Sequence, residues 1–294
     1  MSAAKALREL MARETLVVAP GAYDCITARL IEQQGFSAVY MTGAGTSAAR
    51  GGLPDYGLMT MTEMVANAAA IAASVNIPVI ADADTGYGNE LNVVRTVHAY
   101  ERAGVAAIHI EDQVFPKRCG HLDRKEVIAR EAFIAKIRAA ASERRDRDFI
   151  IIARTDAIAV AGFDEAIARA QAALEAGAEM VFVEAPETVE QLRTIPSLVN
   201  GPCLLNMIRG GKTPKVTRGE AQQYGYRMAI LPGILMSAVV AACDEALAAF
   251  KQSGEIPASG SRGTVRDFFR RFGSDEWDAV RNRYGDPAQQ TPRR

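Results

Sequence analysis

Four segments of the chain repeat one order of residues: an alanine-rich amphipathic helix, a glycine, and a short run of mostly apolar residues. The glycines are Gly35, Gly104, Gly177 and Gly225. Glycine readily adopts the left-handed conformation that the C-cap of a helix needs. The pattern therefore predicts helices that each end at a glycine and lead into a strand.

The apolar runs are continuous and do not alternate with polar residues, which is typical of strands buried on both faces of a parallel sheet. We expect eight strands, each followed by a helix, at residues 16–21, 38–43, 78–84, 107–113, 149–156, 180–185, 203–207 and 227–231. Eight βα units over about 250 residues indicate the α/β class and a single (β/α)8 TIM barrel.

The end of the chain has a different composition. Residues 252–262 are rich in Gly, Ser and Pro, and beyond them charges of both signs alternate with aromatic residues. The aromatic residues are Phe268, Phe269, Phe272, Trp277 and Tyr284. We predict a catalytic barrel over residues 1–251 and a linker with a C-terminal helical tail over 252–294. The aromatic density suggests that the tail packs on something, such as a neighbouring subunit.

Charge and cysteine content exclude several classes of protein. The chain has 34 Lys+Arg against 35 Asp+Glu, a net charge of −1, so no global field attracts nucleic acid or an anionic membrane. The longest apolar stretch, 234–250, contains Asp244 and Glu245, which favours a buried helix over a membrane span. The four cysteines form no disulfide or zinc pattern, and the charged N-terminus lacks a signal-peptide core, so we expect the cytoplasm.

Carboxylates gather at the expected C-terminal ends of the strands, where TIM barrels build their active sites. Asp82 and Asp84 are two residues apart and point to the same side of a strand, and Glu111 ends the next strand. Confined carboxylates are costly unless a cation neutralises them. Carboxylates and waters suit Mg²⁺, with Mn²⁺ as the alternative, whereas the histidines and cysteines lack zinc spacing.

The connection from the fourth strand to the next helix is long for a βα loop, which indicates a functional segment. It contains Lys117, Arg118, Cys119, Gly120 and His121 in succession. A thiol flanked by cations and a histidine is expected to have a lowered pKa and to exchange protons near neutral pH. The glycine would allow the loop to act as a lid.

Two other motifs match nucleotide-binding loops incompletely. Residues 43–48 fit G-x-G-x-x-A and would suggest a nicotinamide oxidoreductase, but Gly51, Gly52 and Pro54 interrupt the helix that should follow. Residues 206–213 would form a phosphate-binding loop only if Asn206 were glycine. We therefore disfavour both interpretations.

The segment Lys117–His121 resembles the signature of the isocitrate lyase/phosphoenolpyruvate mutase superfamily, in its lyase branch. Further matching segments are PGAYD (20–24), YMTGAG (40–45), GLPD (52–55), DADTGYG (82–88), HIEDQ (109–113), ARTDA (153–157) and NMIRGGKTP (206–214). The resemblance implies a magnesium-dependent TIM barrel that forms a homotetramer, a dimer of dimers, with the last helix swapped between subunits.

The resemblance also implies roles for individual residues. Asp84 would ligate the metal directly, Asp82 and Glu111 partly through water, and Asp55 would support the metal shell. Cys119 would donate a proton. The implied catalytic set is Lys117, Cys119, His121, Arg154 and Glu184. The implied substrate-binding set is Thr42, Gly43, Ala44, Asp82, Gly120, Arg154 and Asn206.

The implied reaction is cleavage of a 2-hydroxydicarboxylate, such as 2,3-dimethylmalate or 2-methylisocitrate, to pyruvate and a carboxylate. Cys119 favours a lyase, because superfamily members that act on carbon–phosphorus bonds lack this cysteine. An oxaloacetate decarboxylase or hydrolase, or a carbon–phosphorus mutase, is the alternative. Arg209 stands where an acidic residue is expected. It would favour a further substrate carboxylate if it faced the mouth, and would have no role if it faced solvent.

Overall fold

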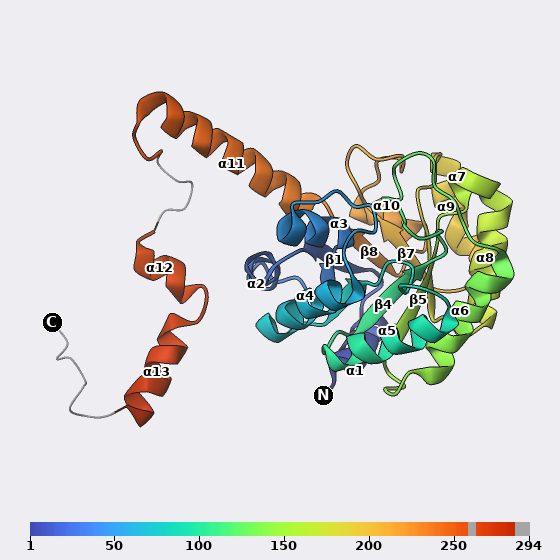
Figure 1. Ribbon diagram of the computed structural model, residues 1–294, viewed down its shortest axis with the longest axis horizontal. Helices are drawn as coiled ribbons and strands as arrows, with labels where there is room; N and C mark the ends of the chain where they lie inside the picture. The colour runs from blue at the N-terminus through green and yellow to red at the C-terminus, as the bar shows by residue number, and fades with distance from the viewer. Residues whose placement is uncertain (258–262, 286–294) are drawn as a thin grey trace. The chain divides into compact units, whose positions relative to one another are not determined.

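A closed barrel of eight parallel strands forms the body of the molecule in the computed structural model, which describes residues 1–257 and 263–285 (Figure 1). The strands pair in chain order, and β8 closes the barrel by pairing with β1. They are β1 (Val17–Ala22), β2 (Val39–Met41), β3 (Val79–Asp82), β4 (Ala107–Glu111), β5 (Ile150–Thr155), β6 (Met180–Val183), β7 (Cys203–Asn206) and β8 (Met228–Leu231). The predicted (β/α)8 barrel is confirmed.

Helices follow every strand, and those of the barrel surround it (Figure 1). They are α1 (Ala3–Arg13), α2 (Cys25–Gln33), α3 (Gly43–Thr46), the π-helix η1 (Ser47–Gly51), α4 (Met61–Ser74), α5 (Glu90–Arg102), α6 (Arg130–Glu143), α7 (Ile158–Ala161), α8 (Phe163–Glu175), α9 (Val189–Val199), α10 (Arg218–Gln223) and α11 (Ile234–Ser253). The four glycines predicted to end helices all have positive φ, between +80° and +106°. These helix ends are where the sequence places them.

Strand residues contribute alternately to two buried apolar layers. One layer combines interior residues such as Ile80, Ile152 and Phe182 with Leu7 and Leu10 of α1. The other layer joins the intervening strand residues to the surrounding helices. Because both faces of each strand are buried, the apolar runs are continuous in the sequence.

The interior positions become polar at the C-terminal ends of the strands. Two residues after an interior apolar or histidine side chain come buried polar residues, and these are Asp82, Glu111, Arg154, Glu184 and Asn206. Strand alternation carries these side chains to the same side as the interior layer. The fold thus concentrates charge at one end of the barrel.

The chain divides into two compact units, Met1–Val239 and Val240–Arg294. The expected domain boundary at residue 251 lies near the end of α11 and stays a prediction. The second unit contains α12 (Val265–Arg270) and α13 (Ser274–Tyr284), in agreement with a helical tail. Residues 258–262 of the predicted linker and 286–294 of the predicted tail lie outside the described residues.

The prediction of a buried helix over residues 234–250 is wrong for the single chain, because α11 has no buried side chain. Its apolar residues include Val240 and Leu247, which are 55% and 69% exposed. Across residues 1–257 and 263–285, no helix has both the length and the apolar character needed to cross a membrane.

Candidate active site

The loop lysine Lys117 reaches into the carboxylate cluster at the end of β3. Its Nζ lies 2.8 Å from Asp84 Oδ1 and is also hydrogen-bonded to Asp55. Burial, together with the nearby charges of Asp82 and Asp55, raises the pKa of Asp84 to about 6 despite this cation. Although burial opposes its charge, Asp84 and Asp55 hold the pKa of Lys117 well above its usual value. Negative charge therefore remains crowded here even with the lysine in place.

The residues after β2 lie against Asp82. The Gly43 N–H donates to Asp82 Oδ2 at 3.2 Å, and Thr42 caps the short helix α3 by accepting from Gly45 N–H at 3.3 Å. A Cβ at position 43 would lie 2.4 Å from Asp82 Oδ2, so only glycine allows this approach. Burial opposes the charge of Asp82, but interactions with His109, Lys117 and Arg154 outweigh it and lower the pKa to about 2. The predicted carboxylate-binding residues 42–44 are thus beside a predicted metal ligand.

Tyr40 and His109 form a buried layer beneath these carboxylates. The Tyr40 hydroxyl lies 2.9 Å from His109 Nε2 and donates to Asp82 Oδ2 at 3.4 Å. Burial lowers the pKa of His109 to about 4, so the imidazole is neutral at pH 7. The sequence analysis assigned neither residue a role. Their spacing was the available signal, because Tyr40 precedes Thr42 by two residues and His109 precedes Glu111 by two.

Arg154 lies between Glu111 and Asp156 at the ends of β4 and β5. Its Nε is 2.9 Å from Asp156 Oδ2 and 3.2 Å from Glu111 Oε2. Burial opposes the charge of Arg154, but Asp156 and Glu111 raise its pKa well above the usual value. Burial also raises the pKa of Glu111 well above its usual value. Among the described residues, neither Glu111 oxygen accepts a hydrogen bond.

The donor set fits a hard divalent cation. Carboxylate oxygens are the ligands that Mg²⁺ prefers. Among the described residues the buried Glu111 oxygens accept no hydrogen bond, although Oε2 pairs with Arg154, and they fit such a ligand role. The structure brings Asp55, Asp82, Asp84 and Glu111 to one end of the barrel. Within the described ranges, however, no three carboxylate, imidazole or thiol groups form a ready-made metal cage.

His121 ties the tip of the loop to the ends of β6 and β7. Its Nε2 lies 2.8 Å from Glu184 Oε1, and the Lys212 N–H donates to its Nδ1 at 3.1 Å. Asn206 Nδ2 also donates to Glu184 Oε1, at 3.1 Å. Burial opposes the charge of Glu184, but the hydrogen bond from His121 lowers its pKa.

Cys119 is held at the mouth by its backbone, since its N–H donates to the Asp55 carbonyl at 3.1 Å. Burial raises the pKa of its thiol, so the expected lowering is wrong. The sequence argument counted the neighbouring cations but not the desolvation of a half-buried thiol. A raised pKa keeps the proton on sulfur at neutral pH, which a proton donor requires.

The sequence analysis did not find Lys125. Its side chain is 1% exposed, and its Nζ donates to the Gly120 carbonyl at 2.5 Å and to Asp156 Oδ1 at 2.9 Å. No motif marks this lysine, since its role depends on a contact between the loop and β5. Arg209 is exposed, which supports the alternative in which it faces solvent.

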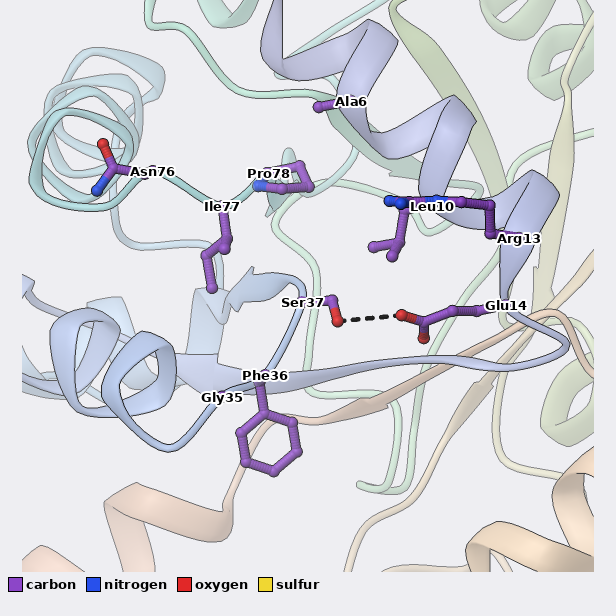
Figure 2. A pocket seen from close by; sticks show the side chains of 10 residues that line it. All are labelled: Ala6, Leu10, Arg13, Glu14, Gly35, Phe36, Ser37, Asn76, Ile77 and Pro78. Carbon is purple, nitrogen blue, oxygen red and sulfur yellow. Dashed lines mark hydrogen bonds between the residues drawn. The ribbon is translucent and has the colours of Figure 1, made fainter.

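A separate cavity of about 620 Å³ lies at the opposite end of the barrel (Figure 2). It is lined by α1 and by the turns that precede β2 and β3, and its walls include Leu10, Phe36 and Ile77. The Ser37 hydroxyl donates to Glu14 Oε1 at 3.0 Å within it. TIM-barrel chemistry takes place at the C-terminal ends of the strands, so this cavity is not the candidate active site.

A half-buried thiol, a buried arginine and a carboxylate cluster that fits a divalent cation define the C-terminal end of this barrel as an enzyme site for an oxygen-rich anion. The chain belongs to the phosphoenolpyruvate mutase/isocitrate lyase superfamily: the family model described as phosphoenolpyruvate phosphomutase matches residues 7–251. The family predicted from the sequence is thereby confirmed.

The curated relatives include two lyases. The chain is 50% identical over 232 residues to the 2,3-dimethylmalate lyase of Eubacterium barkeri, covering 79% of this chain and 80% of that protein. It is 44% identical over 248 residues to the 2-methylisocitrate lyase of Aeropyrum pernix, covering 84% of this chain and 80% of that protein.

Solved structures share the whole architecture. A 2,3-dimethylmalate lyase structure superposes with a TM-score of 0.92 at 41% identity, covering 98% of this chain and 97% of that one. An oxaloacetate acetylhydrolase bound to 3,3-difluorooxalacetate superposes with a TM-score of 0.93 at 38% identity, covering 98% of each chain. A phosphonopyruvate hydrolase solved with oxalate and Mg²⁺ superposes with a TM-score of 0.87 at 33% identity, covering 97% of this chain and 99% of that one.

Proposed function

We propose that this chain cleaves the carbon–carbon bond of a 2-hydroxydicarboxylate, such as 2,3-dimethylmalate or 2-methylisocitrate, to give pyruvate and a simple carboxylate. The observation that carries the proposal is the position of Cys119, on a loop bound to the ends of the strands and close to Arg154, where burial raises the pKa of the thiol. The lyase class predicted from Cys119 is confirmed by the curated relatives, which are lyases of these two substrates.

The carboxylate cluster would hold Mg²⁺, or Mn²⁺ in its place. Asp84 would be the direct ligand, Asp82 and Glu111 would act partly through water, and Asp55 would support the shell. When bound, the metal would stabilise negative charge on the oxygens of the substrate and the 2-oxo acid product. The Glu111 oxygens that accept no hydrogen bond within the described residues support this assignment, as does the Mg²⁺ in the related hydrolase structure.

The side chains divide the remaining work. Thr42, Gly43 and Ala44 would bind the carboxylate of the 2-oxo acid portion, with Asn206 on the opposite wall. The substrate reacts as its 2-alkoxide, after the hydroxyl proton has passed to solvent before the loop closes. The alkoxide oxygen becomes the carbonyl oxygen of the 2-oxo acid as the carbon–carbon bond breaks, and the electron pair of that bond remains on the departing fragment, where the Arg154 guanidinium stabilises the negative charge. The loop excludes water, and the Cys119 thiol then transfers its proton to the carbanion carbon.

Two further loop residues, Lys117 and His121, hold the closed loop against the ends of the strands. Lys117 pairs with Asp84 and Asp55, and His121 is bound to Glu184. These contacts join the segment that carries Cys119 to β3 and β6. The same contacts neutralise part of the negative charge that a dianionic substrate would otherwise meet.

A second candidate reaction is hydrolysis of oxaloacetate. The structural similarity to an oxaloacetate acetylhydrolase, at 38% identity over 98% of the chain, favours it as the alternative. A carbon–phosphorus mutase is a weaker alternative, since that reaction has no step in which the Cys119 thiol would protonate a carbanion. The substrate panel below includes oxaloacetate and phosphonopyruvate for this reason.

We also propose a cytoplasmic homotetramer, a dimer of dimers, that exchanges its C-terminal helices between subunits. The apolar face of α11 that is exposed in a single chain supports the exchange. All four cysteines are free, which fits a reducing compartment.

The test is release of pyruvate from a panel of hydroxy-diacids, oxaloacetate and phosphonopyruvate, with Mg²⁺ and after complete chelation. We expect pyruvate from an alkylated malate, at least about 100-fold less without metal, and restoration by Mg²⁺. Cys119→Ser should lower turnover by about 10³-fold, because a hydroxyl is a much weaker acid than a thiol, while the variant still binds oxalate. Metal-independent cleavage, or full turnover by Cys119→Ser, would contradict the proposed mechanism.

A further inference from the structure

The loop that carries Cys119 has a stem and a tip. The stem is held by two backbone hydrogen bonds, from Val114 N–H to the Glu126 carbonyl at 2.8 Å and from Ile128 N–H to the Asp112 carbonyl at 2.9 Å. Residues 115–125 form the tip between them. The stem fixes where the tip begins and ends, but the position of Cys119 over the strands depends on contacts made by the tip itself.

Lys125 makes one such contact from inside the protein. Its buried ammonium group donates to the Gly120 carbonyl, next to Cys119, and to the Asp156 carboxylate that follows β5. Hydrogen bonds from a charged donor to a buried carboxylate and carbonyl are among the stronger polar contacts in proteins. Lys125 therefore binds the backbone of the tip to the barrel.

Asp156 is shared between this lysine and Arg154. Its Oδ2 accepts from Arg154 Nε at 2.9 Å, and its Oδ1, which binds Lys125, also accepts from Arg154 Nη2 at 3.3 Å. The Asp156 N–H donates to Asp112 Oδ1 at 2.8 Å, which fixes the carboxylate's own backbone. The position of the tip and the orientation of Arg154 therefore both depend on the Asp156 carboxylate.

We propose that Lys125 is a positioning residue for the lyase reaction: it holds the tip closed through the Gly120 carbonyl and, through Asp156, couples that closure to the orientation of Arg154. This inference rests on the proposed function only for its effect on turnover. The positional effect on the loop stands on the contacts of Lys125 alone.

Loss of the ammonium group has two consequences. The Gly120 carbonyl loses its charged donor, so the open form of the tip becomes more populated. Among the described residues, Asp156 then keeps only Arg154 as its side-chain cation, so the orientation of the guanidinium changes. In the open form the Cys119 thiol is more accessible, and it reacts faster with an alkylating reagent.

The experiment measures the rate at which iodoacetamide alkylates Cys119, by mass spectrometry of the peptide that contains it, in the full-length protein at neutral pH. We expect Lys125→Met to raise this rate about tenfold, and the rate at exposed Cys25 in the same molecule to stay unchanged. Lys212→Met is the matched control, because Lys212 also ties the loop, through Asp123, but its side chain is 28% exposed. Its effect should stay within about twofold.

Turnover gives the second measurement. In Lys125→Met we expect kcat to fall about 10- to 100-fold and KM to change less than about threefold, since Cys119 and Arg154 act on the developing carbanion. If the variant fails to fold, Lys125→Gln, which keeps a neutral donor, is measured instead. Folded protein with wild-type alkylation of Cys119 would overturn the proposal. Faster alkylation in an enzyme inactive on every tested diacid would uphold the loop role and refute the proposed substrate class.

Discussion

Gly120 lies where the loop packs tightly against side chains of the barrel, and its lack of a side chain is what allows this contact. A Cβ at this position would lie 2.6 Å from Arg154 Nη2 and 2.6 Å from Glu184 Cγ. The sequence analysis explained the glycine by the conformational freedom of a lid. Among the described residues, however, Gly120 is not one of the glycines with positive φ. The reason for glycine here is close approach.

We therefore predict that Gly120→Ala lowers kcat about 100-fold, because the methyl group must displace either the loop or Arg154. Thermal stability should change little, since residues 115–125 are not part of the buried apolar clusters. Gly219→Ala is the matched control, because nothing lies within 4 Å of a Cβ there and its φ is ordinary. Steady-state kinetics and thermal melting of both variants check the prediction. Wild-type turnover in Gly120→Ala would show that the loop does not close as described.

At the scale of elements, the site depends on how helix α8 is fastened to the end of β4. Arg169 of α8 is 5% exposed and donates to Asp112 Oδ2 at 3.1 Å and to the Ile128 carbonyl at 2.8 Å. Asp112 also accepts from the Thr155 hydroxyl and the Asp156 N–H. One arginine thus joins a helix, a loop stem and two strand ends.

Removing this arginine leaves a buried carboxylate without its cation. We predict that Arg169→Met lowers the free energy of unfolding by about 3 kcal/mol, as expected for breaking a buried ion pair from one side. Arg193→Met is the control, because Arg193 pairs with Glu190 on the exposed face of α9 and should cost less than about 0.5 kcal/mol. Urea unfolding followed by circular dichroism measures both. If Arg169→Met were as stable as Arg193→Met, the ion pair between Arg169 and Asp112 would not be what holds α8.

At the scale of the whole molecule, α11 has an apolar face that the single chain leaves uncovered. Val240, Cys243, Leu247 and Phe250 recur at helical spacing on one side, and all four are exposed. Monomeric proteins rarely expose such a continuous apolar stripe. Cover by a second copy of the chain is the arrangement that we propose.

We predict that the wild-type chain is a tetramer by size-exclusion chromatography with light scattering. The double substitution Val240→Glu and Leu247→Glu should shift it to smaller species, because charged side chains cannot be buried at such an interface without a partner. Lys251→Gln changes the charge of the same helix without touching the apolar face, and should leave the mass unchanged. A monomeric wild type, or a tetramer that survives the double substitution, would refute the exchange of helices.

The fold was predictable because its determinants are local and repeated. Continuous apolar runs are required of strands buried on both faces, and Gly35, Gly104, Gly177 and Gly225 end helices by their own backbone preference. The expected helix over 234–250 exists, but its burial could not be read from the sequence. An apolar face is the same whether it packs inside one chain or against another.

The sequence by itself determined the barrel, the family and the end of the barrel where polar residues gather, since each follows from periodicity or from motifs of adjacent residues. Only the tertiary structure decided that burial raises the pKa of Cys119, that Lys117 lies among the carboxylates, and that Lys125 meets Gly120 and Asp156. The physical reason is that desolvation and long-range ion pairs depend on which groups the fold brings within a few ångströms of one another. Spacing along the chain records neither quantity.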